Sequence, residues 1–220
     1  MWVAGKQFYF GNRFRNMGFL IAVEGIDGAG KTTIAKHIKE ILEDFGFRAE
    51  VLKEPGDSVY GKMIKNSESR FPPEKELELF ILDRIEDVNK NILPKVNAGI
   101  CVIMDRYYYS NVAYQGALGI DPEEILRKNE EIAPKPDLTI LLDVSPDIAL
   151  KRIQKRQKIT PFEEAEYLER VRELYLSIKS EEIRVVDAGQ PLDDVKSEVY
   201  QLVMELISSR GSFFEMAMRK

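Results

Sequence analysis

The sequence predicts an α/β fold, a three-layer domain with a mostly parallel five-stranded sheet flanked by helices. Three observations predict it. Continuous apolar runs occur at FLIAVE (19–24), ICVIMD (100–105) and LTILLD (138–143), and strands without alternation are buried on both faces, as a parallel sheet requires. Segments with helical periodicity separate these runs. The resulting strand–helix–strand order implies right-handed crossovers.

The first half of the chain predicts two strands and two helices. After the first strand, a helix is expected over 31–46, where apolar residues recur at helical spacing and Gly46 provides the stop. A short strand follows at 48–53. A long helix begins after Pro72-Pro73 and is expected to end by Pro94, because proline interrupts helices. Its apolar stripe steps by four and three through Leu77, Ile81, Ile85, Val88 and Ile92.

The second half continues the alternation after the strand at 100–105. Asp121 is expected to cap a helix at 121–133 that has proline at its first helical position. The remaining elements are expected in this order: strand 138–143, helices from Pro146 and through 163–180, strand 183–188, and a helix from Pro191. The domain should therefore span residues 18–209, between an N-terminal extension at 1–17 and a C-terminal tail at 210–220.

Composition narrows the class of protein. The chain has 220 residues and a net charge of -5, which fits one domain and argues against a general nucleic-acid binder. No apolar stretch approaches the length of a membrane span, so no membrane association is expected. The single cysteine, Cys101, lies in an apolar run and predicts a buried thiol in a reducing compartment, the cytoplasm. With His37 as the only histidine, zinc chemistry and a Ser-His-Asp triad are disfavoured.

A phosphate-binding loop carries the strongest functional signal. The segment GIDGAGKT (25–32) matches G-x-x-x-x-G-K-[ST] between a predicted strand and a predicted helix. Its glycines let backbone N–H groups converge on phosphate oxygens at a helix N-terminus. Lys31 would reach the β- and γ-phosphates of ATP, and the Thr32 hydroxyl would bind Mg²⁺. The residues expected to bind ATP phosphates are Gly25, Ile26, Asp27, Gly28, Ala29, Gly30, Lys31, Thr32 and Thr33.

Other motifs separate the classes that use this loop. A GTPase would carry Asn-Lys-x-Asp, whereas the only Asn-Lys here, at 89–92, lies in a predicted helix and lacks the aspartate. A motor or transporter ATPase would end its second acidic strand in Asp-Glu, whereas these strands end in MDR and LDV. A small kinase that passes the γ-phosphoryl group to an acceptor remains.

Candidate acceptor residues follow the strands and the long helix. Phe80 and Arg84 are four apart, so one face could stack on a base and hydrogen-bond its edge, although an arginine packed over a partly exposed phenylalanine explains the spacing equally well. Arg106 follows the strand that ends in Asp105, where a guanidinium can hold a monophosphate and the carboxylate can order Mg²⁺; a local salt bridge is the alternative. Tyr107, Tyr108 and Tyr109 cannot all face one pocket, so at least one must pack.

A lid is expected at KRIQKRQKITPFEE (151–164). Arg152 and Arg156 are four apart and share a helical face, from which they could neutralise charge on the transferring phosphoryl group. A solvated charged helix end is the alternative. The predicted catalytic residues are Lys31, Asp105, Arg152 and Arg156, and the predicted metal ligands are Thr32 and Asp105.

Taken together, these segments resemble the thymidylate kinase family, a family of P-loop nucleoside monophosphate kinases. The resemblance covers about residues 18 to 207. It rests on EGIDGAGKTT, KEPG, LFILDR, DRYYYSNVAYQG, PDLTILLDV and DAGQPLDDV, which occur in the family's order and approximate spacing. The block that begins at Asp105 is highly specific, whereas the phosphate loop alone is not. The resemblance implies the P-loop kinase domain, phosphorylation of dTMP by ATP with Mg²⁺, and a homodimer.

The resemblance also implies roles for acceptor-binding residues. Arg106 would hold the acceptor phosphate, and Asp27 would contact its sugar. Tyr114 would lie against the deoxyribose and disfavour a 2′-hydroxyl. The complete expected set is Asp27, Glu54 of the Glu-Pro signature, Phe80 stacked on thymine, Arg84 at its edge, Arg106, Asn111 and Gln115 reading the base, and Tyr114.

Two positions depart from the family pattern. Lys53 stands where many members have arginine, and lysine keeps the charge without the two-pronged geometry. Gly28 stands where some members carry a loop arginine, so the transition-state arginine is expected from the lid. The alternatives are a kinase for another nucleoside monophosphate or a deoxynucleoside, and a catalytically inactive nucleotide-binding paralogue.

Overall fold

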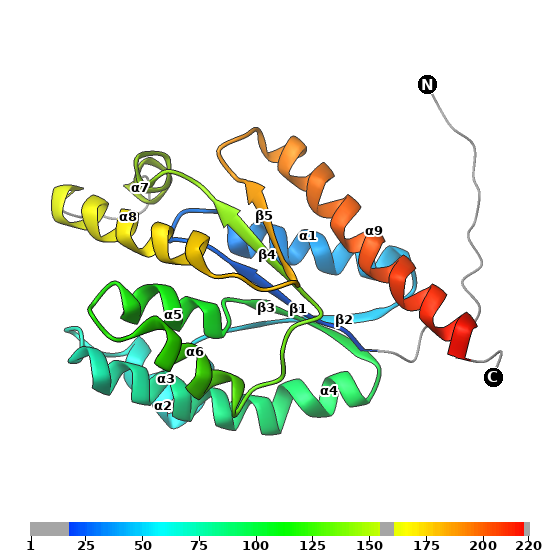
Figure 1. The fold of residues 1–220 in the computed structure, drawn as a ribbon, viewed down its shortest axis with the longest axis horizontal. Coiled ribbons are helices and arrows are strands. Elements are labelled where there is room, and N and C mark those ends of the chain that lie inside the picture. The colour runs from blue at the N-terminus through cyan, green and yellow to red at the C-terminus, as the bar shows by residue number, and fades with distance from the viewer. Residues whose placement is uncertain (1–17, 155–160, 218–220) are drawn as a thin grey trace.

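A computed structural model describes residues 18–154 and 161–217 (Figure 1). Within them the strands form one all-parallel sheet in the order β2-β3-β1-β4-β5, which confirms the predicted α/β class. The strands are β1 (Leu20–Glu24), β2 (Arg48–Lys53), β3 (Ile100–Asp105), β4 (Leu138–Asp143) and β5 (Ile183–Asp187).

Helices cover both faces of this sheet. They are α1 (Lys31–Asp44), α2 (Val59–Lys65), α3 (Pro73–Asp87), the π-helix η2 (Val88–Ile92), α4 (Leu93–Asn97), α5 (Tyr108–Gly116), α6 (Pro122–Glu130), α7 (Pro146–Gln154), α8 (Pro161–Ser177) and α9 (Leu192–Ala217). Helices α1 and α9 pack together on one side of the sheet, and α3 to α6 lie together on the other, with α8 against α5 (Figure 1). Two of these helices, α2 and α5, were not expected from the sequence.

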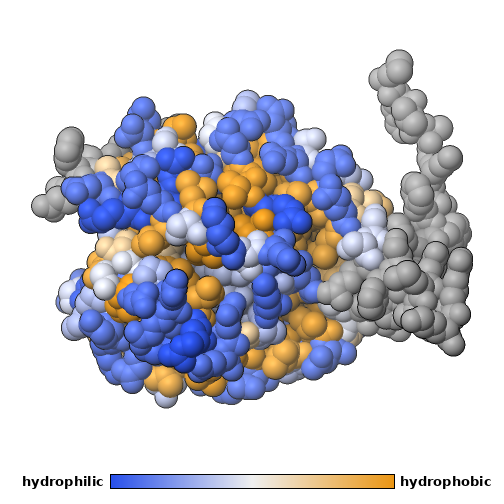
Figure 2. Space-filling view, in the orientation of Figure 1, coloured by the Kyte–Doolittle hydropathy of each residue, from blue (hydrophilic) through white to orange (hydrophobic). Residues whose placement is uncertain are grey.

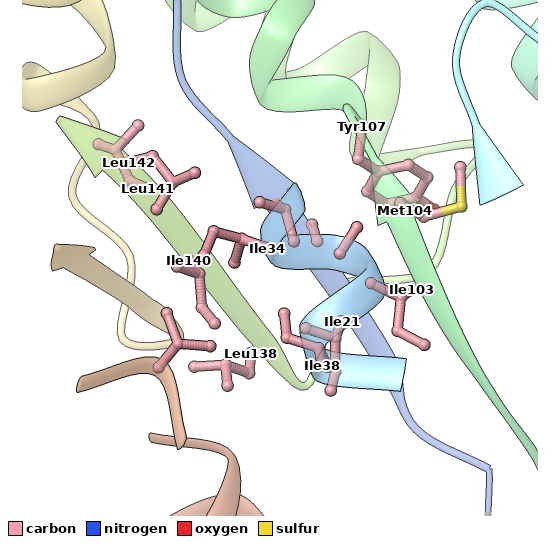
Figure 3. Close-up of a cluster of buried hydrophobic side chains, with 14 of the residues drawn as sticks. Ile21, Ile34, Ile38, Ile103, Met104, Tyr107, Leu138, Ile140, Leu141 and Leu142 are labelled. Carbon is pink, nitrogen blue, oxygen red and sulfur yellow. The ribbon is translucent and has the colours of Figure 1, made fainter. Parts of the chain in front are cut away.

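The core lies where β1, β3 and β4 meet α1. Ile21, Ile103 and Ile140 come from the three strands and lie close to Ile34 and Ile38 of the helix (Figure 3), and all five are at most 1% exposed. Because every strand runs in the same direction, the carboxyl ends of the strands, which carry polar residues, all lie at the same end of the sheet. Ligands bind at that end in such folds.

The long helix continues past Pro94, so the expectation that it ends there was wrong. Helix α3 widens into the π-helix η2 before α4 begins at Leu93 with Pro94 in its first turn. A proline in an α-helix removes one hydrogen bond and collides with the carbonyl four residues earlier, and a π-turn lengthens the spacing at that point. The stripe also differs, because Ile85 is only half-buried whereas the charged Arg84 is buried.

The ends of the expected domain fall partly outside the described residues. The N-terminal extension 1–17 and residues 155–160 of the expected lid are not described. Helix α9 runs to Ala217, past residue 210 where the tail was expected to begin. No helix among the described residues has both the length and the apolar character needed to cross a membrane.

Figure 2 shows apolar residues gathered around the edge strand β5, where Val185 is 50% exposed.

Candidate active site

The phosphate loop joins β1 to α1 at the carboxyl end of the central strand of the sheet. Gly25, Gly28 and Gly30 all have positive φ, at 138°, 85° and 101°. The loop also packs too closely for side chains, because a Cβ at Gly25 would lie 2.5 Å from the Leu142 carbonyl oxygen and one at Gly28 would collide with that of Ala149. Glycine is therefore required by both conformation and space at Gly25 and Gly28, and by conformation at Gly30, where a Cβ would meet nothing within 4 Å.

Lys31 turns back into this loop. Its Nζ donates hydrogen bonds to the carbonyl oxygens of Gly25 (2.9 Å) and Ile26 (2.8 Å), and the residue is 7% exposed. Burial lowers the pKa of Lys31 to about 7, and the nearby Arg106 adds to the shift. A bound anion would restore the charged form, so the ammonium group is suited to exchange carbonyl partners for phosphate oxygens.

Thr32 and Asp105 meet across the loop and the end of β3. The Thr32 hydroxyl donates to Asp105 Oδ2 at 2.5 Å, and Lys53 Nζ lies 3.9 Å from the same oxygen. Within the described residues, no group of three or more His, Cys, Asp or Glu side chains could hold a metal ion. A hydroxyl with one carboxylate nevertheless fits Mg²⁺, which usually takes one or two protein oxygens and completes its shell with water and substrate phosphates.

Arg106 points its guanidinium at the loop from a strained backbone. Its φ is 75°, a left-handed conformation that costs a non-glycine residue roughly 1–2 kcal/mol. Nη2 donates to Asp27 Oδ1 (2.5 Å) and Tyr114 Oη (3.1 Å), while Nη1 donates to Ser110 Oγ (3.1 Å). Burial opposes the charge of Asp27, but Arg106 and Lys31 hold the pKa of this carboxyl below its usual value. Three predicted acceptor residues are thus brought together at one point.

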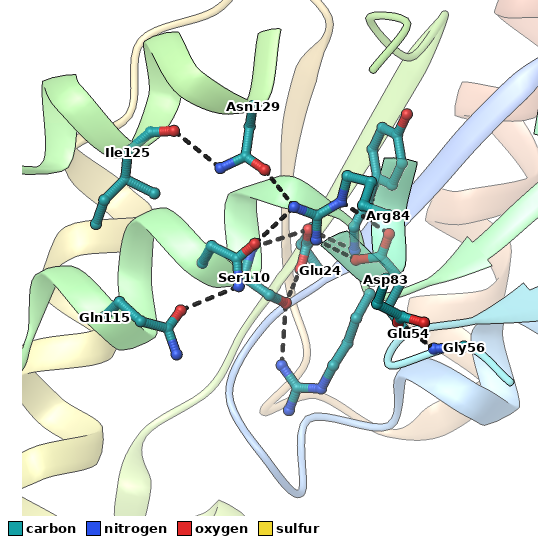
Figure 4. Close-up of polar contacts among 12 residues, drawn as sticks. Glu24, Glu54, Gly56, Asp83, Arg84, Ser110, Gln115, Ile125 and Asn129 are labelled. Carbon is teal, nitrogen blue, oxygen red and sulfur yellow. Dashed lines mark hydrogen bonds and ion pairs between the residues drawn. The ribbon is translucent and has the colours of Figure 1, made fainter. Parts of the chain in front are cut away.

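Glu24, the last residue of β1, was missed by the sequence analysis. It is fully buried, and its Oε1 accepts hydrogen bonds from the backbone N–H groups of Tyr107 (2.9 Å) and Ser110 (3.1 Å). Its Oε2 accepts from the hydroxyls of Ser110 (2.6 Å) and Tyr175 (3.0 Å), and Figure 4 shows the contact with Ser110. Burial raises the pKa of Glu24, and these hydrogen bonds oppose the rise. An acidic residue at the end of a fully apolar strand was the available signal.

Arg84 lies inside the protein rather than over an exposed phenylalanine. It is 1% exposed, and its Nε donates to Glu54 Oε1 at 2.8 Å while Nη2 donates to Glu54 Oε2. Nη1 donates to Asn111 Oδ1 (2.6 Å) and to the side chain of Asn129 (Figure 4). Burial raises the pKa of Glu54 to about 7 despite the adjacent Arg84. Helix α3 is therefore tied to the Glu-Pro segment and to α5 and α6.

The neighbouring Asp83 holds the same segment from a second direction, and it too was missed. Its carboxylate accepts from Gly56 N–H (2.6 Å) and from the Ser58 hydroxyl (2.5 Å). Glu54 and Pro55 are joined by a cis peptide bond. Two adjacent side chains of α3 thus fix the loop that carries Glu54.

A cavity of about 240 Å³ opens between these groups. It is lined by every predicted acceptor residue, namely Asp27, Glu54, Phe80, Arg84, Arg106, Asn111, Tyr114 and Gln115. It is also lined by Lys53, Arg70, Glu76 and Ser110, which were not among the predicted site residues. One end therefore holds Arg106 beside the phosphate loop, and the other holds amides and an aromatic ring.

A chain of hydrogen bonds fixes the amides at the second end. Arg84 donates to Asn111 Oδ1, Asn111 Nδ2 donates to Gln115 Oε1 (3.0 Å), and Gln115 Nε2 donates to Glu76 Oε2 (2.9 Å). Arg70 in turn donates to Glu76. Because a guanidinium only donates, Asn111 must turn its carbonyl oxygen toward Arg84, and this orders the whole chain.

The predicted lid arginines lie elsewhere or outside the described residues. Arg152 donates to the carbonyl oxygens of Gly28 (3.4 Å) and Ala188 (2.9 Å), so it lies beside the phosphate loop and does not line the cavity. Arg156 is not described. Helix α8, which begins at the end of the expected lid, bears Arg172, whose Nε and Nη2 donate to the two oxygens of Asp143 at 2.6 and 2.9 Å.

The tyrosine run after Arg106 is packing. Tyr107, Tyr108 and Tyr109 are each at most 1% exposed, and their rings pack in sequence at tilted angles with centroids 4.8 and 4.5 Å apart. Arg84 lies over the Tyr107 ring at 5.6 Å. All three rings therefore pack inside the fold, and Tyr114 is the tyrosine of this segment that lines the cavity.

A phosphate loop beside a cavity at the carboxyl ends of a parallel sheet is typical of P-loop kinases. A family model for thymidylate kinase matches residues 23–199. A probable thymidylate kinase of Archaeoglobus fulgidus is 57% identical over 86% of this chain and 96% of its own. The thymidylate kinase of Xylella fastidiosa M12 is 42% identical over 88% of this chain and 90% of its own. A probable thymidylate kinase of Pyrococcus horikoshii is 42% identical over 84% of this chain and 96% of its own. The chain belongs to the thymidylate kinase family.

Proposed function

We propose that this enzyme transfers the γ-phosphoryl group of ATP to dTMP, yielding ADP and dTDP for dTTP biosynthesis. Family membership makes it a kinase, and its named relatives support dTMP as the acceptor. The observation that carries the proposal is the cavity with Arg106 at the phosphate-loop end and Phe80 with Asn111 among its other lining residues. A nucleoside monophosphate needs a cation at one end and hydrogen-bonding groups with a flat apolar surface at the other.

On the donor side, the phosphate loop from Gly25 to Thr33 would hold the ATP phosphates. Lys31 would leave the carbonyl oxygens of Gly25 and Ile26 for the β- and γ-phosphates. The Thr32 hydroxyl and the Asp105 carboxylate would hold Mg²⁺, which would neutralise charge on the ATP phosphates. Their contact in the structure supports this assignment, because both oxygens already converge on one point.

On the acceptor side, Arg106 would bind the phosphate of dTMP, and Asp27 would contact the sugar. The two side chains form an ion pair, so the acceptor phosphate would compete with Asp27 for the guanidinium. Tyr114 also bonds to both, which supports a place for its ring against the deoxyribose. At the other end, Phe80 would stack on thymine.

The edge of the base would be read by Arg84, Asn111 and Gln115. Four of the five Arg84 N–H groups already have partners in Glu54, Asn111 and Asn129, which leaves one for a thymine oxygen. Asn111 and Gln115 are held in fixed orientations. Glu54 would therefore act on the base by holding Arg84.

Charge on the transferring phosphoryl group would be neutralised by Lys31 and by Arg152 or Arg156 of the lid. Arg152 already lies at Gly28 of the phosphate loop, which supports a role on the donor side. A homodimer in the cytoplasm completes the proposal. The dimer rests on the family resemblance, and Val59 and Met63 on α2 expose apolar side chains that a second copy would cover. The buried thiol of Cys101 suits a reducing compartment.

The deciding experiment measures ADP release from ATP and Mg²⁺ with a panel of acceptors: dTMP, dUMP, UMP, CMP, AMP and thymidine. We expect dTMP to give the highest kcat/KM, and thymidine to be inactive because it has no phosphate for Arg106. Preference for UMP or CMP would replace dTMP as the substrate. Absence of turnover with every acceptor, together with retained ATP binding, would instead identify a nucleotide-binding paralogue.

A further inference from the structure

Glu24 is a buried carboxylate that the proposed reaction does not use. It does not line the acceptor cavity, and it is fully enclosed by β1, α5 and α8. Its two oxygens accept four hydrogen bonds, from the Tyr107 and Ser110 backbone and from the Ser110 and Tyr175 hydroxyls. Burying a carboxylate costs free energy unless the group is hydrogen-bonded. Such a complete set of donors therefore indicates a specific task rather than incidental packing.

The first link is to the backbone of Arg106. This residue holds its left-handed φ of 75° between two hydrogen bonds to β1. Its own N–H donates to the Val23 carbonyl (3.1 Å), and the next N–H, of Tyr107, donates to Glu24 Oε1 (2.9 Å). A strained conformation persists only where the surroundings hold it, and Glu24 supplies one of the two restraints.

The second link is to the Arg106 side chain. The Ser110 hydroxyl has one hydrogen, which it gives to Glu24 Oε2 at 2.6 Å. Its lone pairs are therefore left for the Arg106 Nη1 donor at 3.1 Å. Glu24 thus turns Ser110 into an acceptor for the guanidinium. Figure 4 shows Glu24 and Ser110 in contact.

The third link reaches the helix that follows the expected lid. Tyr175 of α8 donates to Glu24 Oε2 at 3.0 Å, and its oxygen lies 2.9 Å from Ser110 Oγ. The same carboxylate therefore joins the strand before the phosphate loop, the helix after Arg106 and the helix after the lid.

We propose that Glu24 is a positioning residue for acceptor binding, which holds both the strained backbone and the guanidinium of Arg106 in the geometry that receives the acceptor phosphate. The inference rests on the proposed role of Arg106. It assigns to Glu24 no contact with either nucleotide. Its effect should therefore be confined to the acceptor, although Glu24 directly precedes the phosphate loop.

The test uses Glu24→Gln, which keeps the shape but has a single accepting oxygen, so it cannot accept from the two backbone N–H groups and from the two hydroxyls at the same time. Calorimetry measures the affinities for dTMP and for a non-hydrolysable ATP analogue, and steady-state kinetics gives KM for each substrate. We expect the dTMP dissociation constant and KM to rise about 10-fold or more, with ATP-analogue affinity within about 2-fold of wild type. Thr139→Val, a buried substitution of similar size on β4 at an unpartnered hydroxyl, should change neither affinity.

Ser110→Ala provides a second variant that removes only the hydroxyl link. It should weaken dTMP binding in the same direction, and the loss in the double variant with Glu24→Gln should be smaller than the sum of the two single losses, because the Ser110 hydroxyl link is common to both. Equal losses for dTMP and the ATP analogue, a lower melting temperature with unchanged dTMP affinity, or additive effects in the double variant would overturn the inference.

Arg106→Ala separates this inference from the proposed function. If Arg106→Ala leaves dTMP affinity unchanged, the proposed acceptor site is wrong. If Arg106→Ala weakens dTMP binding but neither Glu24→Gln nor Ser110→Ala does, the acceptor site stands and the role of Glu24 is refuted.

Discussion

Arg84 and Glu54 form a buried two-pronged ion pair that joins α3 to the end of β2. Both side chains are almost completely removed from solvent, at 1% and 3% exposure. The pair forms part of the cavity wall, and it sets which N–H of Arg84 remains for a ligand. Its geometry therefore links the stability of the fold to the shape of the proposed acceptor site.

Replacing Arg84 with methionine should destabilise the protein. The loss of the guanidinium leaves the Glu54 carboxylate buried without a partner, which typically costs about 3–5 kcal/mol. Urea unfolding measures the change. Lys90→Ala is the matched control, because Lys90 forms an exposed ion pair with Glu86 one turn away, and such pairs contribute about 0.3–0.5 kcal/mol. Equal losses in the two variants would show that the buried pair has no special weight.

Replacing Arg106 with lysine should weaken dTMP selectively. Lysine keeps the positive charge but cannot reach Ser110, Asp27 and Tyr114 together or bind a phosphate with two parallel hydrogen bonds. We expect KM for dTMP to rise about 10-fold, with KM for ATP within about 2-fold. Arg127→Ala on α6, an exposed residue paired with Glu131, is the control and should match wild type. A rise in KM for ATP of similar size would contradict the assignment.

ATP binding should take up a proton above neutral pH. Burial lowers the pKa of Lys31 to about 7, so in the free enzyme at about pH 8.5 the amine is mostly neutral. Phosphate oxygens raise this pKa again, and the complex therefore gains up to about one proton at that pH and almost none at about pH 6. Calorimetry in two buffers of different ionisation enthalpy measures the uptake.

Lys31→Ala is the reference for that measurement. It should abolish both turnover and the pH-dependent part of the proton uptake, because the titrating group is gone. Turnover close to wild type, or identical proton uptake in the two proteins, would show that Lys31 is not the group concerned.

Replacing Asn111 with alanine should reduce the preference for thymine over cytosine. The Asn111 carbonyl oxygen accepts from Arg84 and keeps a second lone pair, which would accept the N3–H of thymine but has no donor to offer the bare N3 of cytosine. The ratio of kcat/KM for dTMP to that for dCMP should fall about 10-fold. Asn91→Ala on η2, where the amide bonds to Asp87, serves as the control. An unchanged ratio would place base selection elsewhere.

Strands and the phosphate loop were predictable because each depends on local sequence. The runs at 100–105 and 138–143 are apolar throughout and became β3 and β4 with the same bounds. Helix α5 was missed because its sequence, YYSNVAYQG, buries nearly every side chain and shows no clear amphipathic period.

The buried charges were missed for a different reason. Residue type predicts that glutamate and aspartate lie at the surface, whereas Glu24 and Asp83 are buried by partners far away in sequence. Tyr175 lies 151 positions from Glu24, and Gly56 lies 27 from Asp83. Only the fold brings these partners together, so the local sequence around each acidic residue does not show which groups will bury it. The same holds for Arg84, whose partner Glu54 is 30 positions away.

The central place of β1 has a consequence for the newly made chain. Leu20 of β1 pairs with Val102 of β3, and Ile21 of β1 pairs with Leu138 of β4. Strand β1 is therefore synthesised long before β4, the second strand with which it pairs. The same delay applies to the phosphate loop, because Gly25 packs on Leu142 and Gly28 on Ala149. During synthesis an apolar strand with open edges therefore persists while well over a hundred further residues are added, and such strands are prone to aggregate. The phosphate loop of the nascent polypeptide therefore reaches its final conformation late, although its residues are synthesised early.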